Sequence, residues 1–303
     1  MLTGGVGGAK LVLGLQQVMP AADITVIVNT GDDFVHLGLP VSPDIDTLLY
    51  TLAGKANTAQ GWGRQGESWA FMVALRELGG PDWFALGDGD LALHVSRLAA
   101  RADGQPLSAI TARFAAAFGI AARILPMTDN PVATMLDTDI GRLAFQAYFV
   151  ERRCVPVVTG IDFDGAADAR PGPGVLAAIA AAGAIIIAPS NPWLSVDPIL
   201  AVPGIATALR AAAAPVVAVS PIIDGKAIKG PTAKLMTELG LPVTNASIAT
   251  HYRDVIDGLV IDSGDSADGV GIPAATTATL MSTLDDRARV AQTALELAAV
   301  LAT

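Results

Sequence analysis

The sequence is poor in cysteine, in charged residues and in basic residues, which are abundant in disulfide-rich, disordered and nucleic-acid-binding proteins respectively. It has one cysteine, Cys154, in 303 residues, so it forms no internal disulfide, which is typical of a reducing compartment. Charged residues make up 16% of the chain and hydrophobic residues 52%, which is not the composition of a disordered protein. The formal net charge is -10, so the chain does not have the excess of basic residues that binding to a nucleic-acid backbone requires. We therefore expect a globular chain with no nucleic-acid partner.

Uninterrupted apolar runs of membrane-spanning length are also missing. The segment 171–196 carries no charge, but Gly183, Pro189, Asn191 and Pro192 divide it into pieces that are too short to cross a bilayer. No positively charged and apolar leader opens the chain, which is the pattern expected without a secretory signal. We expect a cytoplasmic protein with no membrane partner.

Glycine is abundant at one place, the opening stretch 2–10. A glycine-rich turn between a short strand and a helix lets backbone amides approach a phosphate, and the positive end of the helix favours negative charge there. Two familiar phosphate loops do not fit, because the dinucleotide pattern begun at Gly5 meets Lys10 and the P-loop pattern begun at Gly4 meets Ala9 and Leu11. A tight turn without a ligand remains an alternative. The residues assigned to this phosphate cradle are Thr3, Gly4, Gly5, Gly7, Gly8 and Lys10.

Carboxylates follow the next apolar run, 24–28, which reads as the second strand of a βαβ unit. Asp32 and Asp33 should then emerge at the same sheet edge as the glycines. Phosphate and carboxylates together imply a bridging metal ion.

A second acidic group opens the following helix, for which Ser42 and Pro43 are good starting residues. Asp44 and Asp46 lie in its first turn, where the helix dipole stabilises carboxylates that bind nothing. Residues two apart do not share a face of a regular helix. Both can reach one metal ion only if the helix start is irregular; otherwise one of them caps the helix and the other coordinates.

Further polar groups follow later glycine-rich loops and apolar strands. The loop around Trp62 could cover a planar ligand or simply be anchored by its tryptophan, and the segment 87–94 begins a helix that carries Asp88, Asp90 and His94. The apolar runs 184–188 and 216–219 read as central parallel strands whose ends point into a crevice. The polar residues after these two runs are Ser190, Asn191, Ser220, Lys226 and Lys229, of which the lysines could bind anions or lie in solvent.

The order of these elements predicts an α/β fold, a Rossmann-like doubly wound and mostly parallel sheet with an inserted smaller α+β lobe. The short strand patterns at 123–127, 132–138 and 142–150 suggest a β-rich excursion. We assign 1–60 and 155–303 to the core, with its phosphate and metal site, and 61–154 to the lobe.

Taken together, the motifs resemble those of the 2-phospho-L-lactate transferases of deazaflavin coenzyme F(420) biosynthesis, a family that includes phosphoenolpyruvate transferase relatives. The resemblance runs through nearly the whole chain and depends on the number and order of short motifs. These are GGVGGAK (4–10), VNTGDD (28–33), SPDIDT (42–47), GWG (61–63), PDWF (81–84), LGD (86–88), FQ (145–146), APSNP (188–192) and SPII (220–223).

The resemblance implies a reaction and its substrates. A guanylyl-activated three-carbon phospho-acid, carrying lactate, enolpyruvate or glycerate, reacts with the ribityl hydroxyl of 7,8-didemethyl-8-hydroxy-5-deazariboflavin, and GMP leaves. The resemblance also implies Mg²⁺ and a homodimer. Phosphoryl transfer depends mainly on positioning and on neutralising the phosphate oxygens. Acidic residues at the phosphate cradle suit that chemistry.

Roles follow by similarity. Asp32 and Asp46 are the preferred metal ligands and catalytic residues, with Asp44 and Asp33 in support, and a carboxylate of either pair could help to deprotonate the hydroxyl. The cradle, Asn29, Thr47, Ser190, Asn191 and Ser220 would hold the donor. Trp62, Asp88 and the region of Phe145 would face the deazaflavin.

The chain departs from the family pattern at Gly89, where members usually carry an arginine between two aspartates. Two other interpretations stay open. One is a nucleotide-sugar-binding regulatory protein of the same superfamily, and the other is an NAD(P)-dependent oxidoreductase, which the failed dinucleotide pattern disfavours.

Overall fold

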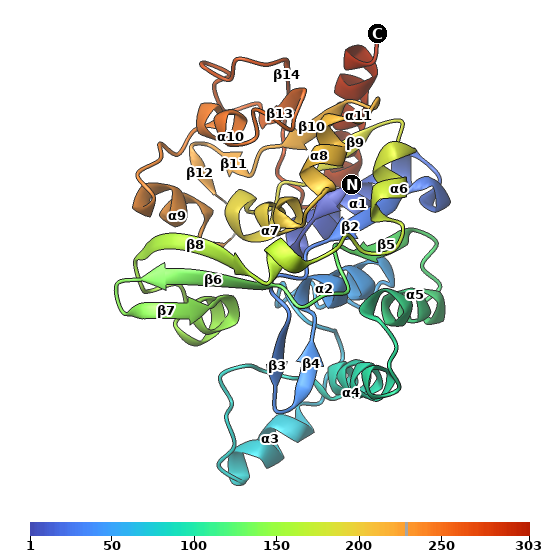
Figure 1. Ribbon diagram of the computed structural model, residues 1–303, viewed down its shortest axis with the longest axis vertical. Coiled ribbons are helices and arrows are strands. Elements are labelled where there is room, and N and C mark those ends of the chain that lie inside the picture. The colour runs from blue at the N-terminus through green and yellow to red at the C-terminus, as the bar shows by residue number, and fades with distance from the viewer. Residues whose placement is uncertain (228–229) are drawn as a thin grey trace.

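The computed structural model describes residues 1–227 and 230–303. In these residues seven parallel strands form a central sheet (Figure 1). Their order across the sheet is β14 (Ala274–Thr277), β13 (Gly258–Asp262), β10 (Val216–Val219), β9 (Ile185–Ile187), β1 (Leu2–Thr3), β2 (Thr25–Val28) and β5 (Arg123–Pro126).

The chain reverses its direction of winding between β1 and β9. From β1 it proceeds outward through β2 to β5, and from β9 it proceeds outward the other way through β10 and β13 to β14. The crevice outside the carboxyl ends of the strands at such a switch point is the usual ligand site of a doubly wound sheet. β1 is only two residues long, yet both are fully buried between two parallel neighbours. The predicted doubly wound α/β class is confirmed.

Alternate residues of the strands build two separate cores. Ile27, Ile187 and Ala218 face one side of the sheet and Val28, Ile186 and Val217 face the other, as the two-residue period of a strand requires. One core is covered by α6 (Val175–Ala180), the π-helical turn η4 (Pro192–Val196), α7 (Asp197–Ala201), α8 (Ile205–Arg210), α9 (Thr232–Glu238) and α10 (Asn245–His251). The opposite core is covered by α1 (Gly5–Val18), α2 (Pro43–Leu52), α5 (Leu107–Ala117) and α11 (Leu284–Leu301).

Helix α1 begins at Gly5, inside the glycine-rich stretch. The glycine-rich stretch is therefore the first turn of the helix and not a loop before it. Gly8 makes this possible, because a side chain there would overlap the Thr3 hydroxyl of β1. The helix thus starts directly beneath the end of the central strand.

Smaller elements surround the carboxyl edge of the sheet. In Figure 1 the hairpin of β3 (Phe34–His36) and β4 (Leu39–Val41) reaches away from the sheet toward α3 (Ala70–Glu77) and α4 (Asp88–Ala102). A three-stranded antiparallel sheet contains β7 (Gly141–Ala144), β6 (Ala133–Thr138) and β8 (Val158–Asp164), and the π-helical turn η2 (Ala147–Glu151) follows β7. The remaining short elements are η1 (Ala21–Asp23), η3 (Ala166–Asp168), β11 (Ile222–Ile223) and β12 (Lys226–Ala227).

These elements do not coincide with the limits 61–154 predicted for the lobe. β5 falls within those limits, but it pairs with β2 as the edge strand of the central sheet, while β8 continues the small sheet to Asp164. A strand as short as β5 has too little periodicity in its sequence to distinguish an edge strand of the central sheet from a strand of the β-rich excursion. The segment predicted as a strand over 142–150 is a strand only to Ala144 and then turns into η2. Among the helices of the described residues, none is long and apolar enough to cross a membrane.

Candidate active site

A cavity of about 970 Å³ opens at the switch point, at the carboxyl ends of β1 and β9. Its floor includes the first turn of α1 and the first turn of α2, and its walls include the loop 60–63, the region 145–150 and the loop 279–282. A volume of this size accommodates a ligand at least as large as a typical drug molecule. Residues from both ends of the chain therefore meet around one space.

Most of the predicted binding residues line this cavity. They are Gly4, Gly5, Gly7, Lys10, Asp32, Asp44, Asp46, Thr47, Trp62, Ser190, Asn191 and Ser220. Thr3, Gly8, Asn29, Asp33 and Asp88 are not among the lining residues. Of the two lysines considered near 220–230, Lys226 is exposed on β12, and Lys229 lies outside the described residues.

The glycine turn at the start of α1 approaches a carboxylate. A Cβ atom at Gly4 would lie 2.5 Å from Asp44 Oδ2 and 2.7 Å from the Ser195 Cβ, so no larger residue fits there without displacement. Gly5 has a φ of 62°, which favours glycine. Ser190 ties the two switch-point strands together, because its hydroxyl donates to the Gly4 carbonyl at 2.8 Å. The glycine turn is thus packed closely against Asp44 and hydrogen-bonded to Ser190.

Asn29 brings two of the predicted carboxylates together. Its side-chain nitrogen donates to Asp32 Oδ1 and to Asp44 Oδ2, each at 3.0 Å, and its oxygen accepts from the Gly31 backbone at 2.7 Å. The two carboxylate oxygens are therefore separated by no more than twice the length of one hydrogen bond. Asp32 is 6% exposed and Asp44 also 6%. We call Asp32 and Asp44 the carboxylate pair.

The electrostatics of the carboxylate pair favour a cation. Burial raises the pKa of Asp32 well above its ordinary value, and the neighbouring Asp44 charge raises it further. Burial also raises the pKa of Asp44 to about 6, against hydrogen bonds from Asn29 and from the Gly5 backbone that lower it. A divalent ion beside the pair would offset the cost of two desolvated negative charges.

Two carboxylates are a donor set that Mg²⁺ and other hard divalent cations can use. In the described part of the chain no group of three or more His, Cys, Asp or Glu side chains is arranged to hold a metal ion. Mg²⁺ usually takes one or two carboxylates from the protein and completes its coordination with water and substrate phosphates. Asp32 and Asp44, beside a helix N-terminus, provide that kind of partial site.

Asp46, the other preferred ligand of the sequence analysis, faces a different partner. Its two carboxylate oxygens accept from the guanidinium of Arg97 on α4, one of them from Nη1 at 3.2 Å. Burial raises the Asp46 pKa, while the Arg97 charge lowers it. α2 begins as a regular helix at Pro43, so residues two apart point differently. Asp44 faces the glycine turn and Asp46 faces α4.

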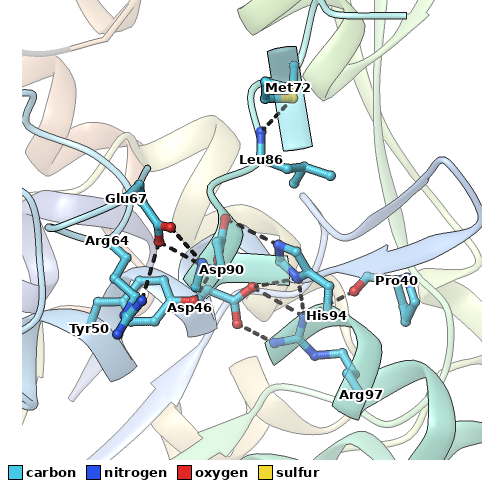
Figure 2. Close-up of polar contacts among 11 residues, drawn as sticks. Pro40, Asp46, Tyr50, Arg64, Glu67, Met72, Leu86, Asp90, His94 and Arg97 are labelled. Carbon is cyan, nitrogen blue, oxygen red and sulfur yellow. Dashed lines mark hydrogen bonds and ion pairs between the residues drawn. The ribbon is translucent and has the colours of Figure 1, made fainter. Parts of the chain in front are cut away.

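The environment of Asp46 continues along α4 (Figure 2). Arg97 Nη1 also donates to the Pro40 carbonyl at 3.1 Å and lies 3.2 Å from His94 Nδ1. His94 Nε2 lies 3.3 Å from Asp90 Oδ2, and the Tyr50 hydroxyl donates to Asp90 Oδ1 at 2.6 Å. Burial alone would raise the Asp90 pKa, but the contacts with His94 and Tyr50 hold it below its usual value.

Two other acidic residues of the predicted site, Asp33 and Asp88, do not line the cavity and accept hydrogen bonds from other parts of the chain. Asp33 accepts from the Ser42 hydroxyl at 2.7 Å, and burial raises its pKa to about 7. Asp88 accepts from the Ala70 and Phe71 backbone at the start of α3. The deazaflavin-facing role of Asp88 stays a prediction, but this carboxylate acts as a helix cap in the structure.

A second carboxylate, that of Glu67, caps the start of α4 at Gly89, the position where this chain differs from the family pattern. Glu67 accepts from the Gly89 and Asp90 backbone at 2.6 and 3.1 Å, so the starts of α3 and α4 each receive a carboxylate from the other segment. The Arg64 guanidinium is 3.6 Å from Glu67 (Figure 2) and fills the space where a side chain at position 89 would project. An arginine is therefore present in this region, from a different position in the chain.

The sequence matches the family described as 2-phospho-L-lactate transferase CofD over residues 1–299. The chain belongs to this family. A phosphoenolpyruvate transferase of Streptomyces griseus is 41% identical over 98% of this chain and 97% of its own length, and a 2-phospho-L-lactate transferase of Methanosarcina mazei is 36% identical over 96% and 97%. A solved member of the UPF0052 family from Bacillus halodurans is similar in fold, with 17% identity and a TM-score of 0.62 over 97% of this chain and 98% of that chain. The suspected family is thereby confirmed.

Membership of the CofD family makes the chain a phospho-transferase and implies a place in coenzyme F(420) biosynthesis. This favours the transferase interpretation over the regulatory and oxidoreductase alternatives. The residues that the sequence analysis undervalued are Asp90 and His94, and it missed Arg97. The signal for them is their spacing of four and three residues, which places all three on one face of a helix.

Proposed function

We propose that this protein transfers a three-carbon phospho-acid from its guanylyl-activated diphosphate to the ribityl hydroxyl of 7,8-didemethyl-8-hydroxy-5-deazariboflavin, releasing GMP. The observation that carries the proposal is the carboxylate pair, packed against the glycine turn at the open switch point. A diphosphate at the start of α1 would meet backbone amides and the positive end of the helix. Its remaining negative charge would meet the ion held by Asp32 and Asp44.

The reaction requires one new bond and one broken bond. The terminal ribityl oxygen bonds to the phosphorus that carries the acid, the bond from that phosphorus to the bridging oxygen breaks, and GMP leaves with that oxygen. The hydroxyl proton passes to a carboxylate of the pair or to water. A bound Mg²⁺ would neutralise charge on the phosphate oxygens. The chain's own contribution is to hold the two substrates in line in a shared cavity.

The two sides of the cavity suit the two substrates. Trp62 is 47% exposed on the loop 60–63, and Phe145 stacks on Phe149 with ring centroids 5.2 Å apart, which suits contact with a flat heterocycle. Ser190, Asn191 and Ser220 line the opposite region after β9 and β10. We assign the aromatic side to the deazaflavin and the polar side to the guanylyl donor.

We propose enolpyruvate as the acid, because the relatives named phosphoenolpyruvate transferase reach 41% and 42% identity, compared with 36% for the Methanosarcina mazei 2-phospho-L-lactate transferase. We also propose a homodimer and a cytoplasmic location, as the family resemblance and the single cysteine suggest.

Mass spectrometry of the product tests the proposal. Purified protein is incubated with Mg²⁺, the deazaflavin acceptor and each of the three guanylyl-activated acids in turn. We expect GMP and a deazaflavin phosphodiester with the mass of the enolpyruvyl adduct. A product with the lactyl or glyceryl mass would correct the donor, and no product with any donor would refute the function.

A further inference from the structure

Arg97 is one of the largest side chains that are completely buried in the described residues, with 1% exposure. A charge in this position is strongly unfavourable unless it is paired and hydrogen-bonded. Asp46 supplies the opposite charge, the Pro40 carbonyl accepts from the Nη1 atom of the guanidinium, and His94 Nδ1 lies 3.2 Å from the same nitrogen. The planar fork of an arginine fits a carboxylate with two parallel hydrogen bonds, which fixes direction as well as distance.

This ion pair joins elements that are far apart in the chain. Arg97 is on α4, Asp46 is in the first turn of α2, and Pro40 is in β4. The first turn of α2 has no cap from its own Ser42 side chain, because that hydroxyl donates to Asp33. The position of the turn therefore depends on contacts from outside the helix, and Arg97 provides the charged one.

The same turn carries a member of the carboxylate pair. Asp44 lies two residues before Asp46, so the backbone that Arg97 fixes through Asp46 is the backbone that holds Asp44 at Asn29 and at the glycine turn. Gly4 leaves no room for Asp44 to shift toward α1. A displacement of this turn would therefore move Asp44 relative to Asn29, the residue that also holds Asp32.

A second contact one helical turn further on aligns the same two helices. Tyr50 lies four residues after Asp46 and donates to Asp90, which in turn faces His94 Nε2 (Figure 2). His94 Nδ1 lies 3.2 Å from Arg97 Nη1 and 3.7 Å from Asp46 Oδ2, and His94 Nε2 lies 3.3 Å from Asp90 Oδ2. α2 and α4 are thus held together at two levels, and the guanidinium is oriented from both sides.

We propose that Arg97, oriented by His94, is a positioning residue that sets the separation of Asp32 and Asp44 and thereby the affinity of the site for a divalent cation. Asp46 acts in this arrangement as the anchor of Arg97 and not as a metal ligand. The inference rests on the proposed function in so far as that function needs a cation at the carboxylate pair. It adds a residue that no motif of the chain indicates.

Mn²⁺ affinity, measured by electron paramagnetic resonance with the protein and GDP in solution, tests the proposal. We expect Arg97→Met to weaken Mn²⁺ binding by about 10- to 100-fold, the usual effect of removing a group that orients a ligand. Arg97→Lys keeps the charge without the planar fork, so its affinity should lie between the two. In the transfer assay kcat should fall while the KM for the deazaflavin stays close to that of the unsubstituted protein.

Two further variants keep the test decisive. Arg113→Met removes an exposed arginine on α5 that stacks on Phe114, the ring that Arg97 also faces, and should leave Mn²⁺ affinity unchanged. If Arg97→Met does not fold, the double variant Asp46→Asn with Arg97→Met removes both buried charges and should fold, yet still bind Mn²⁺ weakly.

The proposal is overturned if a folded Arg97 variant binds Mn²⁺ within about twofold of the unsubstituted protein, or if the unsubstituted protein binds none. Failure of the proposed function is a separate result. In that case no phosphodiester forms, but Mn²⁺ affinity still depends on Arg97.

Discussion

Asp44 and Asp46 lie two residues apart in one helical turn, and the structure predicts opposite effects on stability when each is replaced by asparagine. Asp46→Asn leaves the buried Arg97 charge without its partner. Breaking a buried ion pair on one side costs about 3–5 kcal/mol. Asp44→Asn removes a buried negative charge that lies near Asp32 and has no cation beside it in the metal-free protein, so its unfolding free energy should rise.

The size of the second effect follows from the pKa of Asp44. Its value is about 6 in the folded protein and 3.8 for an ordinary aspartate, so at pH 7.5 the ionised form costs on the order of 2–3 kcal/mol. The 303 residues imply an unfolding entropy of about 0.6 kcal/mol/K. We therefore expect Asp46→Asn to lower Tm by about 5–8 °C and Asp44→Asn to raise it by about 3–5 °C.

The pH dependence of stability provides a second test of whether Asp44→Asn stabilises the protein. Because folding raises the Asp44 pKa, its folded form binds more protons than its unfolded form between about pH 4 and pH 6, and stability is lost as pH rises through that window. Below pH 4 the carboxyl is neutral in both states and costs nothing. The stability gained by Asp44→Asn should therefore disappear at pH 4.

Differential scanning calorimetry in excess chelator measures these effects, with the exposed Asp103→Asn as the matched control. Both Asp44→Asn and Asp46→Asn should be inactive in GMP release, the first because the cation site has lost a ligand and the second because its anchor is gone. An Asp46→Asn protein as stable as the unsubstituted one, or an Asp44→Asn protein less stable than it at pH 7.5, would refute this account of the two carboxylates.

Three further predictions concern the cavity. Excess EDTA should abolish GMP release and added Mg²⁺ should restore it; undiminished release in chelator would remove the metal from the reaction. Gly4→Ala places a Cβ 2.5 Å from Asp44 Oδ2 and should weaken Mn²⁺ binding by about tenfold or more, whereas Gly183→Ala, which meets nothing within 4 Å, should not change it. Trp62→Ala should raise the KM for the deazaflavin with little change in Tm, because the side chain is 47% exposed; an unchanged KM would place the flat ring elsewhere.

Much of the fold could be predicted because its signals are local. The apolar runs 184–188 and 216–219 contain strands of the central sheet, and their carboxyl ends bring Ser190 and Ser220 to the cavity. The glycine turn and Asp32 converge as the rule for parallel strands requires. β5 was harder to place, because a strand of four residues shows too little periodicity to distinguish a sheet edge from an inserted lobe.

The different contacts of Asp44 and Asp46 could not be predicted, although the sequence does show that a regular helix start would separate the two side chains. Which carboxylate faces the glycine turn depends on what lies on the other side, and Arg97 is 51 residues away in the sequence. In the sequence, Arg97 is one of two arginines on an amphipathic helix, where the default expectation is a solvated side chain. Only its spacing from Asp90 and His94 hints at a polar stripe on the buried face of α4. A sheet edge is specified by local patterns, but the partner that fixes a buried charge is specified by packing, and the candidate site depends on both.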